Sequence, residues 1–231
     1  MSKAISYLEW LRRFIRFKLW WLKAKPLNDE GIAKLSTSIA LKIGIKPFKY
    51  IKEANAPFYN AVVFGLRCRT IIITKALHNL SWDYIEAVLL HEYAHCKLKH
   101  SIKITITASM LLSILTGITI YELQFLSTIA DAMILMMVFV FAYISIHMLL
   151  KYITRKFELE ADLFAISNTS NPCSYLKLLA FLGQWEKNKE DLISKLLATH
   201  PLARTRIKNI LKKFPYFMKC FEQDYGGPGG I

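Results

Sequence analysis

The chain has 231 residues, 54% of them hydrophobic, and it carries a formal net charge of +14. A soluble domain rarely combines so apolar a composition with so large a charge, whereas a membrane protein with basic flanks commonly does. The charge is not accompanied by a glycine-rich or aromatic nucleic-acid-binding motif, so we expect no nucleic-acid partner. The composition therefore favours a protein that interacts with the lipid bilayer.

The four cysteines are scattered along the chain and form no C-x-x-C motif; they are Cys68, Cys96, Cys173 and Cys220. Small secreted domains that depend on disulfides carry denser cysteine frameworks than this. The spacing therefore predicts reduced thiols in a cytosol-facing environment.

Residues 1–25 carry seven basic residues and one acid, Glu9, interleaved with tryptophan, leucine and phenylalanine. The segment has no uncharged run long enough to span a bilayer, and it lacks the apolar core and cleavage site of a signal peptide. It predicts a basic amphipathic helix on an anionic membrane surface. The alternative is a helix that packs on the folded domain.

Residues 26–103 predict a mixed helical and β region. A break at 26–30 precedes a helix over 29–42, in which apolar residues recur at helical spacing. Short β-like stretches follow at 48–51, 61–64 and 70–74, separated by proline and glycine. The fold class that we expect for this region is mainly α with a small β-sheet.

The helix predicted to begin at Ser81 carries the motif His91-Glu92-Tyr93-Ala94-His95. Residues four apart lie on the same helical face, so both imidazoles can bind one metal ion. Glu92 lies beside them, placed to act on a water molecule as a general base. This H-E-x-x-H arrangement is typical of zinc hydrolases. The alternative is two histidines that lie four apart by chance.

Two later stretches, 104–121 and 132–150, contain no charged residue, and each has about the length of a transmembrane helix. The segment between them, 122–131, has no lysine or arginine. The outer flanks are basic, with Lys97, Lys99, Lys103, Lys151, Arg155 and Lys156. By the positive-inside rule the short loop faces outward and both flanks face the cytoplasm. A buried hairpin in a soluble core would need more surrounding protein than the rest of the chain supplies.

A catalytic zinc ion usually has three protein ligands, so a third must come from elsewhere in the chain. The pattern H-E-x-x-H-x-x-G-x-x-H is excluded, because positions 98 and 101 are Leu98 and Ser101. Glu158 and Asp162 are four apart and share one helical face. We expect Glu158 to be the third ligand and Asp162 to orient a ligand histidine through a hydrogen bond. Glu160 is rotated by about 200° from Glu158 and should face away.

The rest of the chain predicts helices over 176–185, 192–197 and 204–213, with a turn at Thr199-His200-Pro201 and a disordered glycine-rich tail. Pro172 either closes the helix that carries Glu158 or begins the next one. The domain limits that we expect are 1–25 for the amphipathic helix, 26–103 and 151–223 for the two parts of the catalytic domain, 104–150 for the hairpin and 224–231 for the tail.

Together these motifs resemble the HtpX-like and CAAX-prenyl-protease-like integral-membrane zinc metallopeptidases of the gluzincin type. The resemblance covers roughly residues 30 to 212. It is carried by residues 86–95, by Glu158-x-x-Ala161-Asp162, and by Thr199-His200-Pro201 with Arg206. Asn60-Ala61-Val62 is similar to the family's edge-strand motif beside the cleft. The chain departs from HtpX-like members at its start, where a basic amphipathic segment replaces the usual pair of membrane spans.

The resemblance implies that His91, His95 and Glu158 bind one Zn²⁺ per chain, that Glu92 is the catalytic base, and that Asp162 supports a ligand. It makes His200 and Arg206 candidates for stabilising the oxyanion or structuring the cleft; a capping turn and a solvated arginine are the alternatives.

The fold class that we expect for the whole chain is a mainly α, zincin-like α+β catalytic domain with a small β-sheet, interrupted by a two-helix transmembrane hairpin. The function predicted from the sequence is that of a membrane-bound zinc metalloendopeptidase with two transmembrane helices and a cytoplasmic catalytic domain. The substrates implied by the resemblance are misfolded or surplus membrane proteins. The alternative is a catalytically silent membrane adaptor that retains the zincin scaffold. Glu92 argues against the adaptor, since a structural zinc site needs no adjacent base. The sequence leaves the oligomeric state open.

Overall fold

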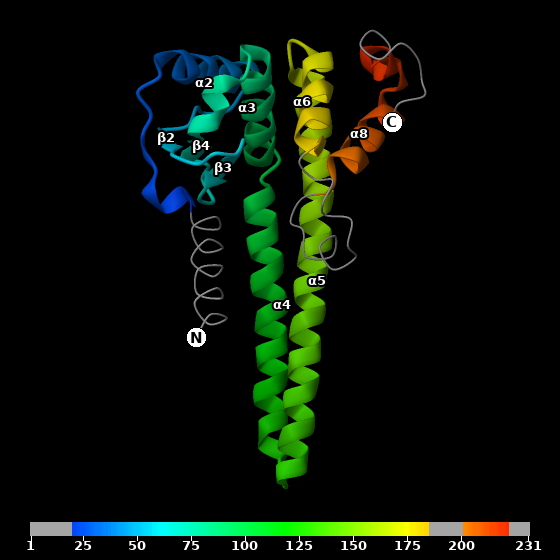
Figure 1. Cartoon of the computed structure of the whole chain (residues 1–231). Helices are drawn as coiled ribbons and strands as arrows, with labels where there is room; N and C mark the ends of the chain where they lie inside the picture. The colour runs from blue at the N-terminus through cyan, green and yellow to red at the C-terminus, as the bar shows by residue number, and fades with distance from the viewer. Residues whose placement is uncertain (1–19, 185–200, 222–231) are drawn as a thin grey trace, which may run out of the picture. The chain divides into compact units, whose positions relative to one another are not determined.

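The computed structural model describes residues 20–184 and 201–221. The greater part of the predicted N-terminal amphipathic helix, the helix predicted over 192–197, His200 and the glycine-rich tail lie outside this part of the chain. The described residues form a mainly helical fold with one small sheet, which confirms the fold class predicted from the sequence (Figure 1).

The chain divides into two compact units, residues 1–93 with 165–178 and residues 94–164 with 179–231. The chain crosses between the units at three points, which fall inside the helices α3 (Trp82–Lys97), α5 (Ile129–Asn168) and α6 (Pro172–Gln184). The domain limits expected from the sequence remain predictions.

The first unit contains a four-stranded sheet with the strand order β1-β2-β4-β3. Its strands are β1 (Lys25–Pro26), β2 (Tyr50–Ala54), β3 (Ala61–Phe64) and β4 (Thr70–Thr74). β2 pairs with β4 in parallel, and the other two pairings are antiparallel. The predicted bounds of β3 and β4 are confirmed, whereas β2 begins two residues later than predicted. β3 lies at an edge of the sheet. β4, whose isoleucines are buried, is one of the two inner strands.

Helix α2 (Glu30–Lys42) begins where its sequence predicts, because the side chain of Asp29 accepts a hydrogen bond from the backbone N–H of Ile32 at 3.0 Å. Its buried Ser36 hydroxyl lies 2.7 Å from the hydroxyl of Tyr93 in α3. The Tyr93 ring also stacks on Phe48, with ring centroids 4.1 Å apart. Burial raises the pKa of Tyr93, so this phenol stays protonated. A buried aromatic residue inside the H-E-x-x-H motif thus anchors α3 to α2.

The start of α3 is held by polar contacts with the turn that follows α5. Asp83 accepts hydrogen bonds from the Asn171 amide at 2.8 Å and the Ser174 hydroxyl at 3.1 Å. The buried carboxylate of Glu86 accepts from the backbone N–H and the hydroxyl of Ser170. Acidic side chains near the start of a helix also interact favourably with its dipole.

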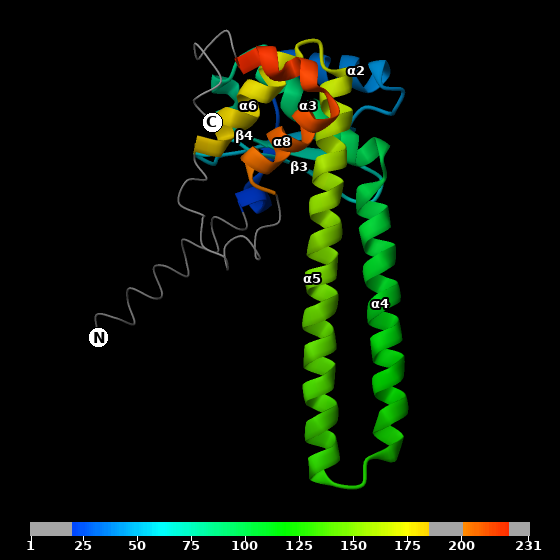
Figure 2. The same ribbon diagram turned by 90° about the vertical axis from the view of Figure 1, so that its right-hand side faces the viewer.

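In the second unit, α4 (His100–Glu122) and α5 form an antiparallel hairpin, joined by the short 3-10 turn η3 (Leu123–Phe125) (Figures 1 and 2). The sequence predicted that a membrane helix ends near Leu150 and that a separate helix carries Glu158. The structure instead has a single helix of 40 residues. The basic stretch between the two parts does not interrupt it, since lysine and arginine are good helix formers.

The remaining described helices are α6 (Pro172–Gln184), α8 (Ala203–Lys213) and the 3-10 turn η4 (Pro215–Met218). Pro172 is therefore the first residue of a new helix, a position where its missing N–H costs little. This settles the alternative that the sequence left open.

The hairpin exposes its apolar side chains. The most apolar windows of the two segments, His100–Phe125 and Ile129–Asn168, have mean hydropathies of 1.8 and 2.4, and none of either window is buried. A hairpin in the core of a soluble protein would be largely covered, so this exposure argues against that alternative. Both helices are long and apolar enough to cross a membrane.

The cysteines correct one expectation. The sequence predicted reduced thiols, but the structure leaves none of the four cysteines free, and each is disulfide-bonded. Disulfides persist in oxidising compartments and, inside cells, chiefly in hyperthermophiles. The cysteines therefore no longer support a cytosol-facing domain, and that orientation rests on the distribution of lysine and arginine.

Candidate active site

Helix α3 supplies two histidines to the site. His91 and His95 lie four residues apart, and both side chains are partly exposed. The helix begins directly after Ser81, whose carbonyl accepts from the backbone N–H groups of Tyr84 and Ile85 at 3.0 Å each. An unbroken helix across the motif places the two imidazoles on one face, as the spacing predicts.

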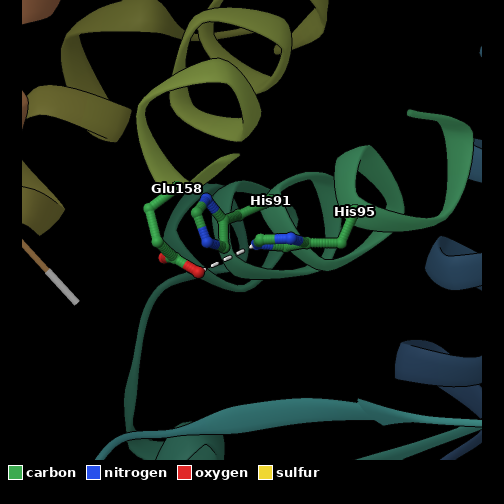
Figure 3. A group of neighbouring side chains, drawn as sticks. All are labelled: His91, His95 and Glu158. Atoms are coloured by element: carbon green, nitrogen blue, oxygen red, sulfur yellow. Dashed lines mark ion pairs between the residues drawn. The ribbon is translucent and has the colours of Figure 1, made fainter. Parts of the chain in front are cut away.

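Helix α5 supplies a carboxylate to the same place. Glu158 Oε1 lies 3.3 Å from His95 Nε2, and Glu158 is 3% exposed. His91, His95 and Glu158 each offer one ligand atom, and these atoms all lie within 4.8 Å of one another. Figure 3 shows the carboxylate directed at the two rings. This is the only such group found among the described residues.

The donor set fits zinc. Two imidazole nitrogens and one carboxylate oxygen are three ligands that catalytic zinc uses, and three ligands leave a fourth position open. The outer nitrogen of His91 supports this reading, because Nδ1 lies 3.3 Å from the hydroxyl of the fully buried Tyr175. That contact leaves His91 Nε2 available for a metal ion.

Glu92 is a neighbour of the ligand group without belonging to it. The residue is half-buried on α3, directly after His91 and about 100° around the helix from it. A general base needs this relation, since it must reach a water molecule without occupying a ligand position.

Asp162 and Arg206 form a pair that the sequence did not predict. The Asp162 carboxylate is completely buried, and it accepts from Arg206 Nε at 2.8 Å and from Nη2 at 2.5 Å. Such a two-pronged contact fixes both side chains and neutralises the buried charge. The sequence assigned Asp162 to a ligand histidine and Arg206 to the oxyanion or the cleft. In the structure the guanidinium of α8 donates two hydrogen bonds to the carboxylate of α5.

Glu160 faces another partner. Its Oε2 lies 3.4 Å from Nε2 of His100, and it does not belong to the ligand group. The two glutamates of α5 are thus separated by the helical rotation, as expected from two residues' spacing.

The predicted substrate strand corresponds to β3 and the residue before it. The N–H of Asn60 donates to Thr74 Oγ1 at 3.0 Å, and its side-chain oxygen accepts from the N–H of Ala61 at 2.9 Å. Val62 pairs with Ile72 of β4. Because β3 is an edge strand, its other side can pair with an added strand.

Sequence reasoning missed His100 and Tyr175, the outer contacts of the two ligand histidines. His100 follows His95 by five residues, but the chain turns between them at Lys99, whose φ of 58° is left-handed. Helical spacing therefore does not apply across that turn. Tyr175 lies 84 residues from His91, and only the tertiary fold joins the two. His200 lies outside the described residues, so its predicted role is not tested.

The chain is similar to known proteins in sequence and in fold. The model of Peptidase family M48 matches residues 26–213. The crystal structure of Ste24p from S. mikatae is similar in fold, with a TM-score of 0.60 and 20% sequence identity. The similarity covers 90% of this chain and 57% of that one, so the chain spans little more than half of that relative's length. The comparison with curated proteins gives no match.

Proposed function

Because the chain belongs to peptidase family M48, we propose that it is a membrane-bound zinc metalloendopeptidase that hydrolyses peptide bonds of misfolded or membrane proteins at the cytoplasmic face. The membership itself makes it a metallopeptidase and confirms the family resemblance predicted from the H-E-x-x-H motif and Glu158-x-x-Ala161-Asp162. The zinc ion, the substrate class and the orientation are the parts that we propose.

One observation carries the proposal: His91, His95 and Glu158 converge with ligand atoms within 4.8 Å of one another. These three residues would hold one Zn²⁺ per chain. When bound, zinc polarises the scissile carbonyl and acidifies a water molecule at the open position.

The protein's own residues supply the proton transfers and the positioning. Glu92 accepts the proton of the attacking water and later donates it to the leaving amine. Arg206 holds Asp162 in its buried position, and we assign it to the support of α5 rather than to the oxyanion. His200 remains a candidate for contact with the oxyanion.

The edge strand β3 supports binding of extended substrates. A peptide that adds to a sheet edge is held through its backbone, and its sequence then matters little. Asn60, Ala61 and Val62 would present that edge. A protease that removes misfolded proteins needs this tolerance, because its substrates share no motif.

The hairpin α4–α5 supports the membrane location. Its loop, residues 122–131, lacks lysine and arginine, while basic residues flank both ends of the hairpin. This asymmetry favours a cytoplasmic catalytic domain.

Asn55→Cys and Phe125→Cys test this orientation with an impermeant thiol reagent on intact cells, since both positions are exposed. We expect labelling at 125 and none at 55. The parent protein is the blank, because its own cysteines are disulfide-bonded.

Hydrolysis is tested with detergent-purified protein and an unfolded protein substrate, with and without a chelator. We expect the chelator to stop hydrolysis and zinc to restore it. Glu92→Gln should lower turnover by about 10²- to 10⁴-fold, the usual contribution of a general base, while zinc stays near one per chain. Glu160→Gln is the matched control, because its carboxylate lies outside the ligand group.

The outcomes separate the two readings of the sequence. A protein that binds zinc but hydrolyses nothing under any condition would be the silent adaptor. Near-normal turnover in Glu92→Gln would remove Glu92 from the mechanism.

A further inference from the structure

The ring of His95 is contacted at both of its nitrogens. Nε2 faces Glu158 Oε1 at 3.3 Å, inside the ligand group, and Nδ1 lies 3.0 Å from Nδ1 of His100. A neutral imidazole carries one proton, so Nε2 is free to bind a metal ion only when that proton is on Nδ1. The N–H of His95 then points at His100, whose Nδ1 must accept it.

The structure holds His100 rigidly in this position. The residue is 3% exposed and begins α4 immediately after the left-handed residue Lys99. Its ring stacks face to face on Phe157 of α5, with centroids 4.3 Å apart and planes within 2° of parallel. The left-handed turn at Lys99 and the stacking on Phe157 thus orient the His100 ring toward His95.

The surroundings of the second nitrogen of His100, Nε2, are compatible with the tautomer in which Nδ1 accepts a hydrogen bond from His95. If Nδ1 accepts from His95, the proton of His100 is on Nε2. Glu160 Oε2 lies 3.4 Å from this nitrogen, which is within ion-pair distance although no described atom completes a well-formed hydrogen bond. The Glu160 side chain is 43% exposed, so its contribution is screened by water.

We propose that His100 is a positioning residue, which accepts the Nδ1 proton of His95 and thereby holds His95 in the tautomer and orientation that present Nε2 to the metal ion. The inference rests on the proposed metal centre and adds a residue that the H-E-x-x-H motif does not contain. Outer hydrogen-bond partners of this kind contribute about 10- to 100-fold to metal affinity.

Two substitutions at position 100 separate the hydrogen bond from the packing. His100→Phe keeps a flat ring against Phe157 but cannot accept a proton from His95. His100→Asn loses the ring, yet places an amide oxygen near the position of Nδ1, where it can accept. We expect His100→Phe to weaken zinc binding by about 10- to 100-fold, and His100→Asn to keep a zinc affinity within about threefold of the parent's. A purely structural role predicts the opposite order.

Zinc affinity is measured by competition with a chromophoric chelator, using metal-free, detergent-purified protein, and peptide hydrolysis is followed in parallel. The cobalt(II)-loaded forms add a spectroscopic readout, because a reoriented His95 changes the absorption of the bound ion. Circular dichroism establishes that each variant is folded. If the Phe variant does not fold, His100→Gln replaces it, since the longer amide cannot reproduce the Nδ1 position.

The result expected is a clear gap between the Asn variant and the Phe or Gln variant. Equal affinities in these variants, whether high or low, overturn the role of His100. A parent protein that binds no zinc would instead refute the proposed function, so the two failures are distinguishable.

Discussion

Helix α5 exposes apolar side chains in its first half and buries carboxylates in its second. Ile129 and Phe141 are 82% and 75% exposed, whereas Glu158 and Asp162 are 3% and 0% exposed. In water, both arrangements would be unfavourable. In the proposed membrane location, lipid around the first half would make its exposure favourable. A metal ion and the Arg206 guanidinium beside the second half would neutralise its charges. One continuous helix would thus pass between two environments, with the change at the basic residues near 151–156.

The largest effect is expected when a metal-binding carboxylate is removed from the buried second half of α5. We expect Glu158→Gln to lose nearly all its zinc and its activity, an effect well beyond the roughly 100-fold upper range for an outer partner. Glu160→Gln should keep both, because the Glu160 carboxylate lies outside the ligand group. Metal analysis of the two purified variants decides it, and the reverse result would assign the third ligand to Glu160.

Removal of the guanidinium tests how the second carboxylate is accommodated. Arg206→Met should lower the free energy of unfolding by about 3–5 kcal/mol, because it removes the guanidinium that neutralises the buried Asp162 carboxylate. The double variant Asp162→Leu/Arg206→Met removes both charges and should recover most of that loss. Denaturation in detergent measures both. Equal losses in the single and double variants would mean that packing, rather than charge pairing, explains the effect.

A charge in the exposed half tests whether lipid surrounds it. Met137 lies near the middle of the apolar stretch and is 63% exposed. Met137→Arg should make insertion of the segment less favourable by about 3 kcal/mol, the penalty for arginine near a bilayer centre. Met137→Leu is the control and should insert normally. An assay that measures membrane insertion of the hairpin reports the difference. Equal insertion of the two variants would indicate that the hairpin lies in water.

The smallest effect is expected at the N-terminus. Deletion of residues 2–24 should weaken membrane association only slightly, because an amphipathic segment binds reversibly whereas a spanning helix is effectively permanent. After carbonate extraction, the truncated protein should remain in the membrane fraction. Its recovery in the soluble fraction would mean that α4 and α5 are not the main anchor.

The sequence by itself determined the parts of this protein that depend on neighbouring residues. The histidines of α3 share a face because they are four apart, and the strands at 61–64 and 70–74 follow from short β-branched runs bounded by turn residues. The two apolar stretches were recognisable from length and the absence of charge. Helical rotation implied that only one of Glu158 and Glu160 can face the metal ion, and the face shared with Asp162 favoured Glu158. The structure places Glu158 beside His95.

Only the tertiary structure decided which side chains meet across the chain. Asp162 pairs with Arg206, 44 residues away, and Tyr175 reaches His91 from a different helix. The contact between His95 and His100 is short in sequence but depends on the left-handed turn at Lys99, which no periodicity predicts. Spacing within a helix fixes which residues share a face; what that face meets depends on packing, which brings together residues that are far apart in the sequence.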